Sequence, residues 1–288
     1  MMLLNRIVLM FFKDKANVFF SLLSALIIIL LYILFLGNVM EQGFESTLGF
    51  SDDRIRVAMA AMIMSGMVAI TTVSACLGAL GIAVIDKKDT GKDFLTSPIP
   101  RWKIAFGYMS GAAVVGIIMG IIALVLVLGY LLSLGGAMPS PADFALLLLT
   151  IVLATLCGNA MMYVICLFIK TENAYSAFTA IVGVLLGFVM GVYMPIGTFP
   201  PAVQWFSRLF PMSHAASMFR QILTRDHLAA LFQGAPVGMA EDFEVTYGVV
   251  FQFGDYTTDF WFSALYLLAW TAIFFIIGVL LLRKQKLK

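Results

Sequence analysis

Six long apolar stretches, with no charged residue between their ends, account for more than half of this chain. They cover residues 18–40, 57–85, 104–134, 144–169, 174–196 and 260–282. Each has at least the ~20 residues that a helix needs to cross a bilayer. Apolar side chains fill every face of these stretches, whereas a helix of a soluble protein keeps one polar face. The pattern predicts an all-α integral membrane protein with six transmembrane helices in one domain, 1–288.

Two further segments combine apolar and polar positions in other ways. Residues 1–16 alternate apolar side chains with Asn5, Arg6, Lys13 and Lys15, which predicts an interfacial amphipathic helix before the first span. The segment 198–259 begins with an apolar part that is too short and too rich in proline to cross the membrane. We expect half-inserted short helices there, followed by a small polar cap before the last span.

The charged residues divide between the two sides that six spans would create. About 13 of the 18 Lys and Arg residues lie near the N-terminus, in the loop 86–103, in the turn 170–173 and in the tail 283–288. About 11 of the 16 acidic residues lie in the other set of loops. Because positively charged loops stay in the cytoplasm, both termini are predicted to be cytoplasmic.

The loop 86–103 is the most distinctive polar segment. It is a charged stretch that contains an apolar pair, Phe94 and Leu95, and ends at Pro98 and Pro100. A short helix along the membrane would present the apolar pair on one side and its charges on the other, as a docking surface for a soluble partner. A solvated loop that only fixes the topology is the alternative on these grounds.

This loop resembles the first cytoplasmic loop of ABC-2 type permeases, the membrane subunits of one class of ATP-binding cassette exporters. A charged cluster, a glycine, an aromatic-Leu pair and a Ser-Pro-Ile-x-Arg string carry the resemblance. The matching residues are Asp86, Lys87, Gly91, Asp93, Phe94, Leu95, Ser97, Pro98, Ile99 and Arg101. A second match follows the fifth span, at Pro200, Pro201, Phe210-Pro211 and Arg220.

The resemblance implies a permease subunit that works as a dimer with two cytoplasmic ATPase subunits. The second permease would be identical or homologous, and ATP and Mg would bind to the partner ATPase. The loop would receive the movement of that ATPase. The residues expected to couple the two subunits are Asp86, Lys88, Asp89, Gly91, Asp93, Phe94, Leu95, Pro98 and Arg101.

Several motifs are missing from the sequence. It has no G-x-x-x-x-G-K-[ST] string, and no Asp, Glu, Lys, Arg or His lies in a predicted span. We therefore expect no enzyme activity, cofactor, metal site or nucleic-acid partner on this chain, and energy from a separate subunit. The 18 Met residues and the aromatic outer segments favour an amphipathic or hydrophobic cargo such as a lipid, peptide or drug. The alternative is a membrane protein without an ATPase, either a channel-like pore or a scaffold of a membrane complex.

Two rows of small residues are candidates for close helix contacts. Gly183, Gly187 and Gly191 clear one face of the fifth span, for packing within the chain or for contact with a second permease. Ser65, Ala69, Thr72 and Cys76 form a small, mildly polar face on the second span. That face either lines a route for the substrate or serves interhelical hydrogen bonding.

Overall fold

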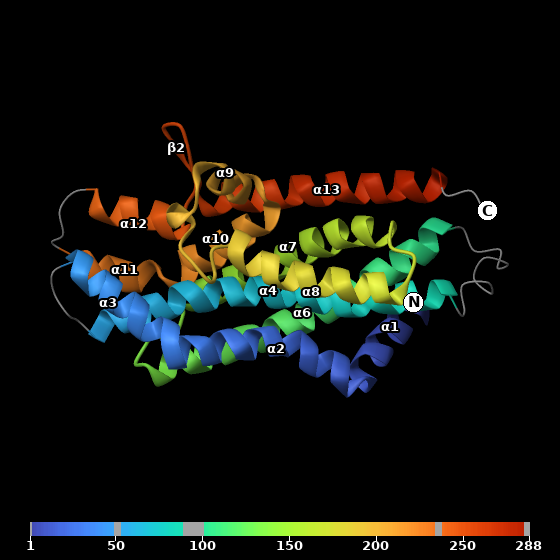
Figure 1. Ribbon diagram of the computed structural model, residues 1–288, viewed down its shortest axis with the longest axis horizontal. Helices are drawn as coiled ribbons and strands as arrows, with labels where there is room; N and C mark the ends of the chain where they lie inside the picture. The colour runs from blue at the N-terminus through green and yellow to red at the C-terminus, as the bar shows by residue number, and fades with distance from the viewer. Residues whose placement is uncertain (1, 49–52, 89–100, 234–237, 285–288) are drawn as a thin grey trace.

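The computed structural model describes residues 2–48, 53–88, 101–233 and 238–284, which form an elongated bundle of helices (Figure 1). Six of its helices are long and apolar enough to cross a membrane, which confirms the predicted all-α membrane fold. They are α2 (Lys15–Leu31), α4 (Asp53–Lys88), α6 (Arg101–Ser133), α7 (Pro141–Cys166), α8 (Glu172–Val189) and α13 (Phe260–Lys284).

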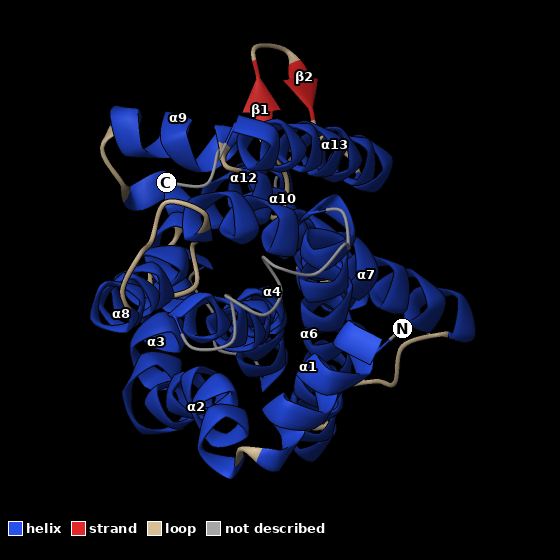
Figure 2. Cartoon of the chain, turned by 90° about the vertical axis from the view of Figure 1, so that its right-hand side faces the viewer, coloured by secondary structure: helices blue, strands red, loops and turns tan. Residues whose placement is uncertain are grey.

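Helix α4 is the central helix of the bundle. Figure 2 shows α2, α6, α8 and α10 (Pro211–Leu223) around it, and α7 also contacts it. Its most apolar window is 83% buried, against 19% for α2 and 17% for each of α8 and α13. Many of its residues are Ala, Gly, Ser or Thr, and small side chains let neighbouring helices approach closely.

Two spans end at positions that the apolar pattern does not show. The first continues from α2 through a π-helical turn, Tyr32–Leu36, into α3 (Gly37–Leu48), so it runs well past residue 40. The fifth span ends at Val189 instead of residue 196. Gly191 has a φ of +66° there, which places it in the left-handed region and stops the helix.

Helix α1 (Met2–Lys13) forms the predicted separate N-terminal helix. Asp14 separates it from α2, because its carboxylate accepts hydrogen bonds from the backbone N–H groups of Ala16 and Asn17 and caps the second helix. Ile7 and Phe11 are fully buried against the bundle, whereas Leu9 and Met10 on the other side are exposed.

The bundle has two unlike ends. Helix α1, the last residues of α4, the start of α6 and the end of α13 lie at one end, which we call the terminal end (Figure 1). The opposite end holds α3 and most of the short elements between α8 and α13. These elements are η2 (Ile196–Thr198), α9 (Pro201–Leu209), α10, α11 (Arg225–Leu231), α12 (Met239–Tyr247) and the hairpin of β1 (Gln252–Phe253) and β2 (Tyr256–Thr257).

The short helices α9 and α10 differ in burial, although a single Phe-Pro pair joins them. Helix α10 lies between α4, α7 and α13, and all of its residues except Gln221 are buried. Helix α9 keeps an exposed apolar side. The predicted half-inserted segment is therefore one helix inside the bundle and one at its surface.

Candidate coupling site

A buried carboxylate joins three helices at the terminal end. Asp86, near the end of α4, accepts two hydrogen bonds from the Arg6 guanidinium of α1, at 2.5 Å to Oδ2 and 2.9 Å to Oδ1. The Tyr108 hydroxyl of α6 donates to Oδ2 at 2.7 Å. The Asp86 side chain is only 6% exposed, and its carboxylate raises the pKa of Arg6. Such a two-pronged, charge-assisted contact fixes both the distance and the orientation of its partners.

Apolar contacts attach α1 to α6 beside this ion pair. Leu3 lies against Gly107 and Ile7 lies against Gly111. A Cβ atom added at Gly107 would lie 2.9 Å from Leu3, and one added at Gly111 would lie 2.8 Å from Ile7. Even an alanine at either position would therefore displace α1. Helix α1 is thus held to α4 by the ion pair and by the Phe11 ring, which lies against Gly78, and to α6 by close packing.

The structure describes only the two ends of the predicted coupling loop. Asp86 lies in the ion pair with Arg6, Lys88 is the last residue of α4, and Arg101 is the first residue of α6. The other six predicted coupling residues, Asp89, Gly91, Asp93, Phe94, Leu95 and Pro98, lie outside the described residues. Their role in docking stays a prediction.

Helix α6 packs against the part of the small face of α4 that holds Thr72 and Cys76. Ser65, Ala69 and Thr72 are fully buried, and the two hydroxyls donate to carbonyl oxygens of their own helix, at 2.7 Å each. Gly116 and Gly120 of α6 make room for Cys76 and Thr72. The packing supports a contact between helices, and the substrate route stays a prediction.

The three glycines at the fifth span have different surroundings. A Cβ atom on Gly187 would overlap the ring of Tyr193 in the same chain, and Gly191 lies beyond the end of α8. Nothing lies within 4 Å of a Cβ atom on Gly183. Among these three, Gly183 therefore has the open face, beside the exposed Val184 and Leu185.

Arg220 is the buried charge for which sequence analysis gave no role. Its guanidinium, fully buried on α10, donates to four backbone carbonyls. These are Met190 and Gly191 at 2.8 Å each, Gly248 at 3.2 Å and Met62 at 3.4 Å. A guanidinium keeps its charge in proteins, so Arg220 brings a positive charge into the interior of the bundle. The sequence named Arg220 only as part of the match that follows the fifth span, and its place directly after Phe219 was a further signal.

Arg220 connects three parts of the opposite end. Its carbonyl partners belong to α4, to the turn after α8 and to the turn after α12. No carboxylate forms an ion pair with it among the described residues. The side chain therefore satisfies carbonyls at two turns and one carbonyl of α4, much as a cap satisfies the carbonyls at a helix end.

Within the described part of the chain, no three His, Cys, Asp or Glu side chains are grouped so that they could hold a metal ion.

A family model described as ABC-2 type transporter matches residues 1–224, from α1 to the end of α10. A comparison with curated proteins found no match.

Proposed function

Because the chain belongs to the ABC-2 type transporter family, we propose that it is the permease subunit of an exporter, moving an amphipathic or hydrophobic substrate outward. Membership of the family supports a permease subunit whose partner is an ATP-binding cassette subunit. The outward direction, the class of substrate, two ATPase copies and a second permease are our proposals. The terminal end would then face the cytoplasm, in agreement with its excess of Lys and Arg.

The ion pair between Arg6 and Asp86 carries this proposal. The loop 86–103 begins at Asp86, so a force on the loop reaches the carboxylate directly. Through Arg6 and Tyr108 the same force acts on α1 and α6. Closure of the ATPase subunits on ATP would thus move α1, α4 and α6 together. Binding and hydrolysis of ATP would shift the permease between a closed and an open conformation.

The weakly buried helices suit a second permease subunit. Helix α8 exposes Ile181, Val184 and Leu185 around Gly183, whose Cβ position is open. Helix α2, also at the edge of the bundle, exposes Phe19, Phe20 and Leu30. These surfaces can contact lipid or another copy, and we propose that the part around Gly183 contacts the second permease.

Purification of the full chain in mild detergent tests the proposal. We expect an ATPase with a P-loop to copurify in a fixed ratio, and ATP hydrolysis by that complex to depend on the loop. Replacing both Phe94 and Leu95 with Ala should reduce that hydrolysis or its coupling to transport, without changing the thermal stability of the permease. Reproducible absence of any ATPase would favour a pore or a scaffold instead.

A further inference from the structure

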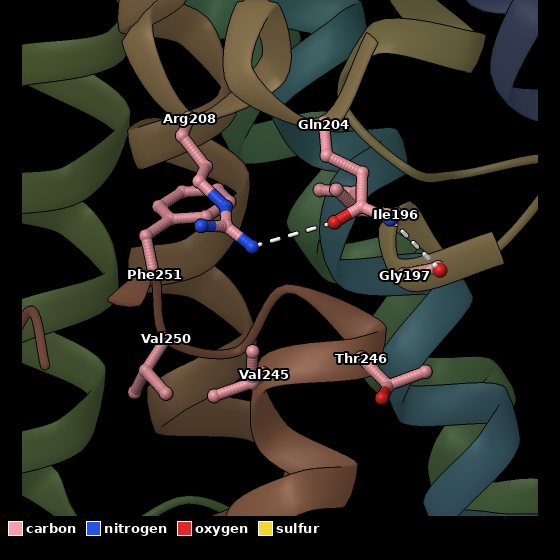
Figure 3. A pocket seen from close by; sticks show the side chains of 8 residues that line it. All are labelled: Ile196, Gly197, Gln204, Arg208, Val245, Thr246, Val250 and Phe251. Atoms are coloured by element: carbon pink, nitrogen blue, oxygen red, sulfur yellow. Dashed lines mark hydrogen bonds between the residues drawn. The ribbon is translucent and has the colours of Figure 1, made fainter. Parts of the chain in front are cut away.

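A pocket at the opposite end lies between α9 and α12 and has a volume of about 190 Å³. Figure 3 shows Gln204 and Arg208 of α9 on one side of it, and Val245 and Thr246 of α12 on the other. Since a water molecule occupies about 30 Å³ in the liquid, the pocket has room for a small headgroup and none for a long chain. Its complete lining is Ile196, Gly197, Gln204, Arg208, Val245, Thr246, Val250 and Phe251.

The cation in this pocket has no acidic partner among the described residues. Arg208 donates to the Gln252 carbonyl at 3.0 Å and to the Gln204 side-chain oxygen at 3.4 Å, which uses two of its five N–H groups. The amide of Gln204 donates in turn to the carbonyls of Gly197 and Phe199, so its oxygen is held toward Arg208. A guanidinium with spare donors binds phosphate or carboxylate oxygens well.

An exposed apolar surface adjoins the pocket on the same helix. Trp205, Phe206 and Leu209 are 52%, 56% and 54% exposed. The Arg208 guanidinium lies 5.6 Å from the centre of the Trp205 ring. At 3.6 residues per turn, Gln204 and Arg208 share one face of α9, and Trp205 begins the neighbouring apolar face. A cation next to such an apolar face is typical of a helix at a membrane surface.

We propose that the pocket binds the headgroup of an anionic phospholipid in the adjacent leaflet. Arg208 pairs with the phosphate, and the acyl chains run along Trp205, Phe206 and Leu209. A choline headgroup would bring a second cation to the guanidinium, so a lipid of net negative charge is preferred. The site lies at the opposite end from the coupling site and requires neither an ATPase partner nor a particular orientation in the membrane.

Native mass spectrometry of the purified full chain tests this site, with phosphatidylglycerol and phosphatidylcholine of the same chain length titrated separately. We expect the protein to bind phosphatidylglycerol about tenfold more tightly, as one charge-assisted contact allows. Arg208→Gln should abolish the preference, and Arg208→Lys should keep part of it. Val245→Trp keeps the cation but fills the pocket, so it should also abolish the preference.

Arg225→Gln is the matched control, because it removes one positive charge near the same end, from a side chain paired with Asp143. We expect it to bind phosphatidylglycerol as the parent does. The proposal is overturned if Arg208→Gln and Val245→Trp both keep the full preference while remaining folded. It is also overturned if glycerol phosphate competes as strongly as phosphatidylglycerol, because the apolar surface would then contribute nothing. If Arg208→Gln does not fold, Val245→Trp and Arg208→Lys still decide the outcome.

Discussion

Arg6 at the terminal end binds a carboxylate, whereas Arg220 at the other end of α4 binds only backbone carbonyls. Both side chains join elements that are distant in sequence, and both use α4 as an anchor. Asp86 and the Met62 carbonyl lie on that one helix, about 36 Å apart at 1.5 Å per residue.

The two kinds of partner differ in whether a second substitution can restore a contact that a first one has removed. The partner of Arg6 is a side chain, so a second substitution can restore the attraction. The partners of Arg220 are carbonyls fixed by the fold, so no second substitution can replace the lost donors. We therefore expect the contact at the terminal end to be adjustable and the one at the opposite end to be fixed.

The largest effect is expected for Arg220→Met, which keeps most of the volume but removes every donor. Four carbonyls lose a charged partner in the interior, at a cost of at least about 3 kcal/mol of stability. Thermal unfolding in detergent should show a large fall in Tm, or no folded protein at all. Arg220→Lys should be intermediate, because one ammonium cannot reach carbonyls in several directions.

The matched control for Arg220 is Arg225→Met. Arg225 begins the next helix, is largely exposed and pairs with Asp143. An exposed pair of this kind contributes about 0–1 kcal/mol. Equal Tm values for the Arg220→Met and Arg225→Met variants would mean that the hydrogen bonds from Arg220 to the carbonyls do not stabilise the fold.

Charge reversal at the other arginine should have a smaller and reparable effect. Arg6→Asp and Asp86→Arg each place like charges together at a buried position, and each should lower the Tm and the ATPase activity of the assembled complex. The double variant restores opposite charges, and we expect it to recover about 1–3 kcal/mol of coupling energy in a double-mutant cycle. If the effects of the two substitutions on Tm and on ATPase activity simply add in the double variant, the ion pair has no part in coupling.

Gly187→Ala tests the turn that Arg220 binds. The new methyl group would overlap the Tyr193 ring and disturb the carbonyls of Met190 and Gly191 nearby. Such overpacking costs about 1–3 kcal/mol, which a urea or thermal titration of the monomer would detect. Gly183→Ala is the control, since its Cβ position is open. A bulkier Gly183→Trp should leave the monomer stable and weaken a permease dimer in crosslinking experiments.

Tyr108→Phe is the mildest of these changes. It removes one hydroxyl that donates to Asp86 and leaves both hydrogen bonds from Arg6. A loss of about 1 kcal/mol in thermal unfolding is expected, with a modest change in coupled ATPase activity. A loss as large as that of Arg6→Asp would show that the hydroxyl, and not the ion pair, positions the carboxylate.

The number and approximate places of the spans could be predicted because the ~20-residue length needed to cross a bilayer is visible in any apolar stretch. The burial of α10 could not. Its sequence has Ser213, His214 and Arg220 among apolar residues, and its depth depends on carbonyls supplied by α4 and two distant turns. Likewise, Asp86 was predicted to matter from the loop that follows it, but nothing in the local pattern identified Arg6, eighty positions earlier, as its partner.

The glycine spacing left its packing partner open for a related reason. A G-x-x-x-G pattern shows that a helix can be approached closely, but it does not show by what. Glycines of α6 face side chains of α1, α4 and α7, and Gly187 faces a tyrosine of the same chain. Of the three glycines in the predicted fifth span, Gly183 has the open Cβ position, and its contact with a second permease stays a prediction.

The regular glycine spacing of α6 has a consequence for how α1 is held in register. Leu3 and Ile7 are four residues apart, as are Gly107 and Gly111 beneath them. After a slide of one helical turn, about 5.4 Å, only one of the two side chains would still face a glycine, because residue 115 is a valine and residue 103 is a lysine. The two recesses therefore fit α1 at one position on α6. The Arg6–Asp86 ion pair holds the same position from α4, so shape and charge together set the resting position of the N-terminal helix.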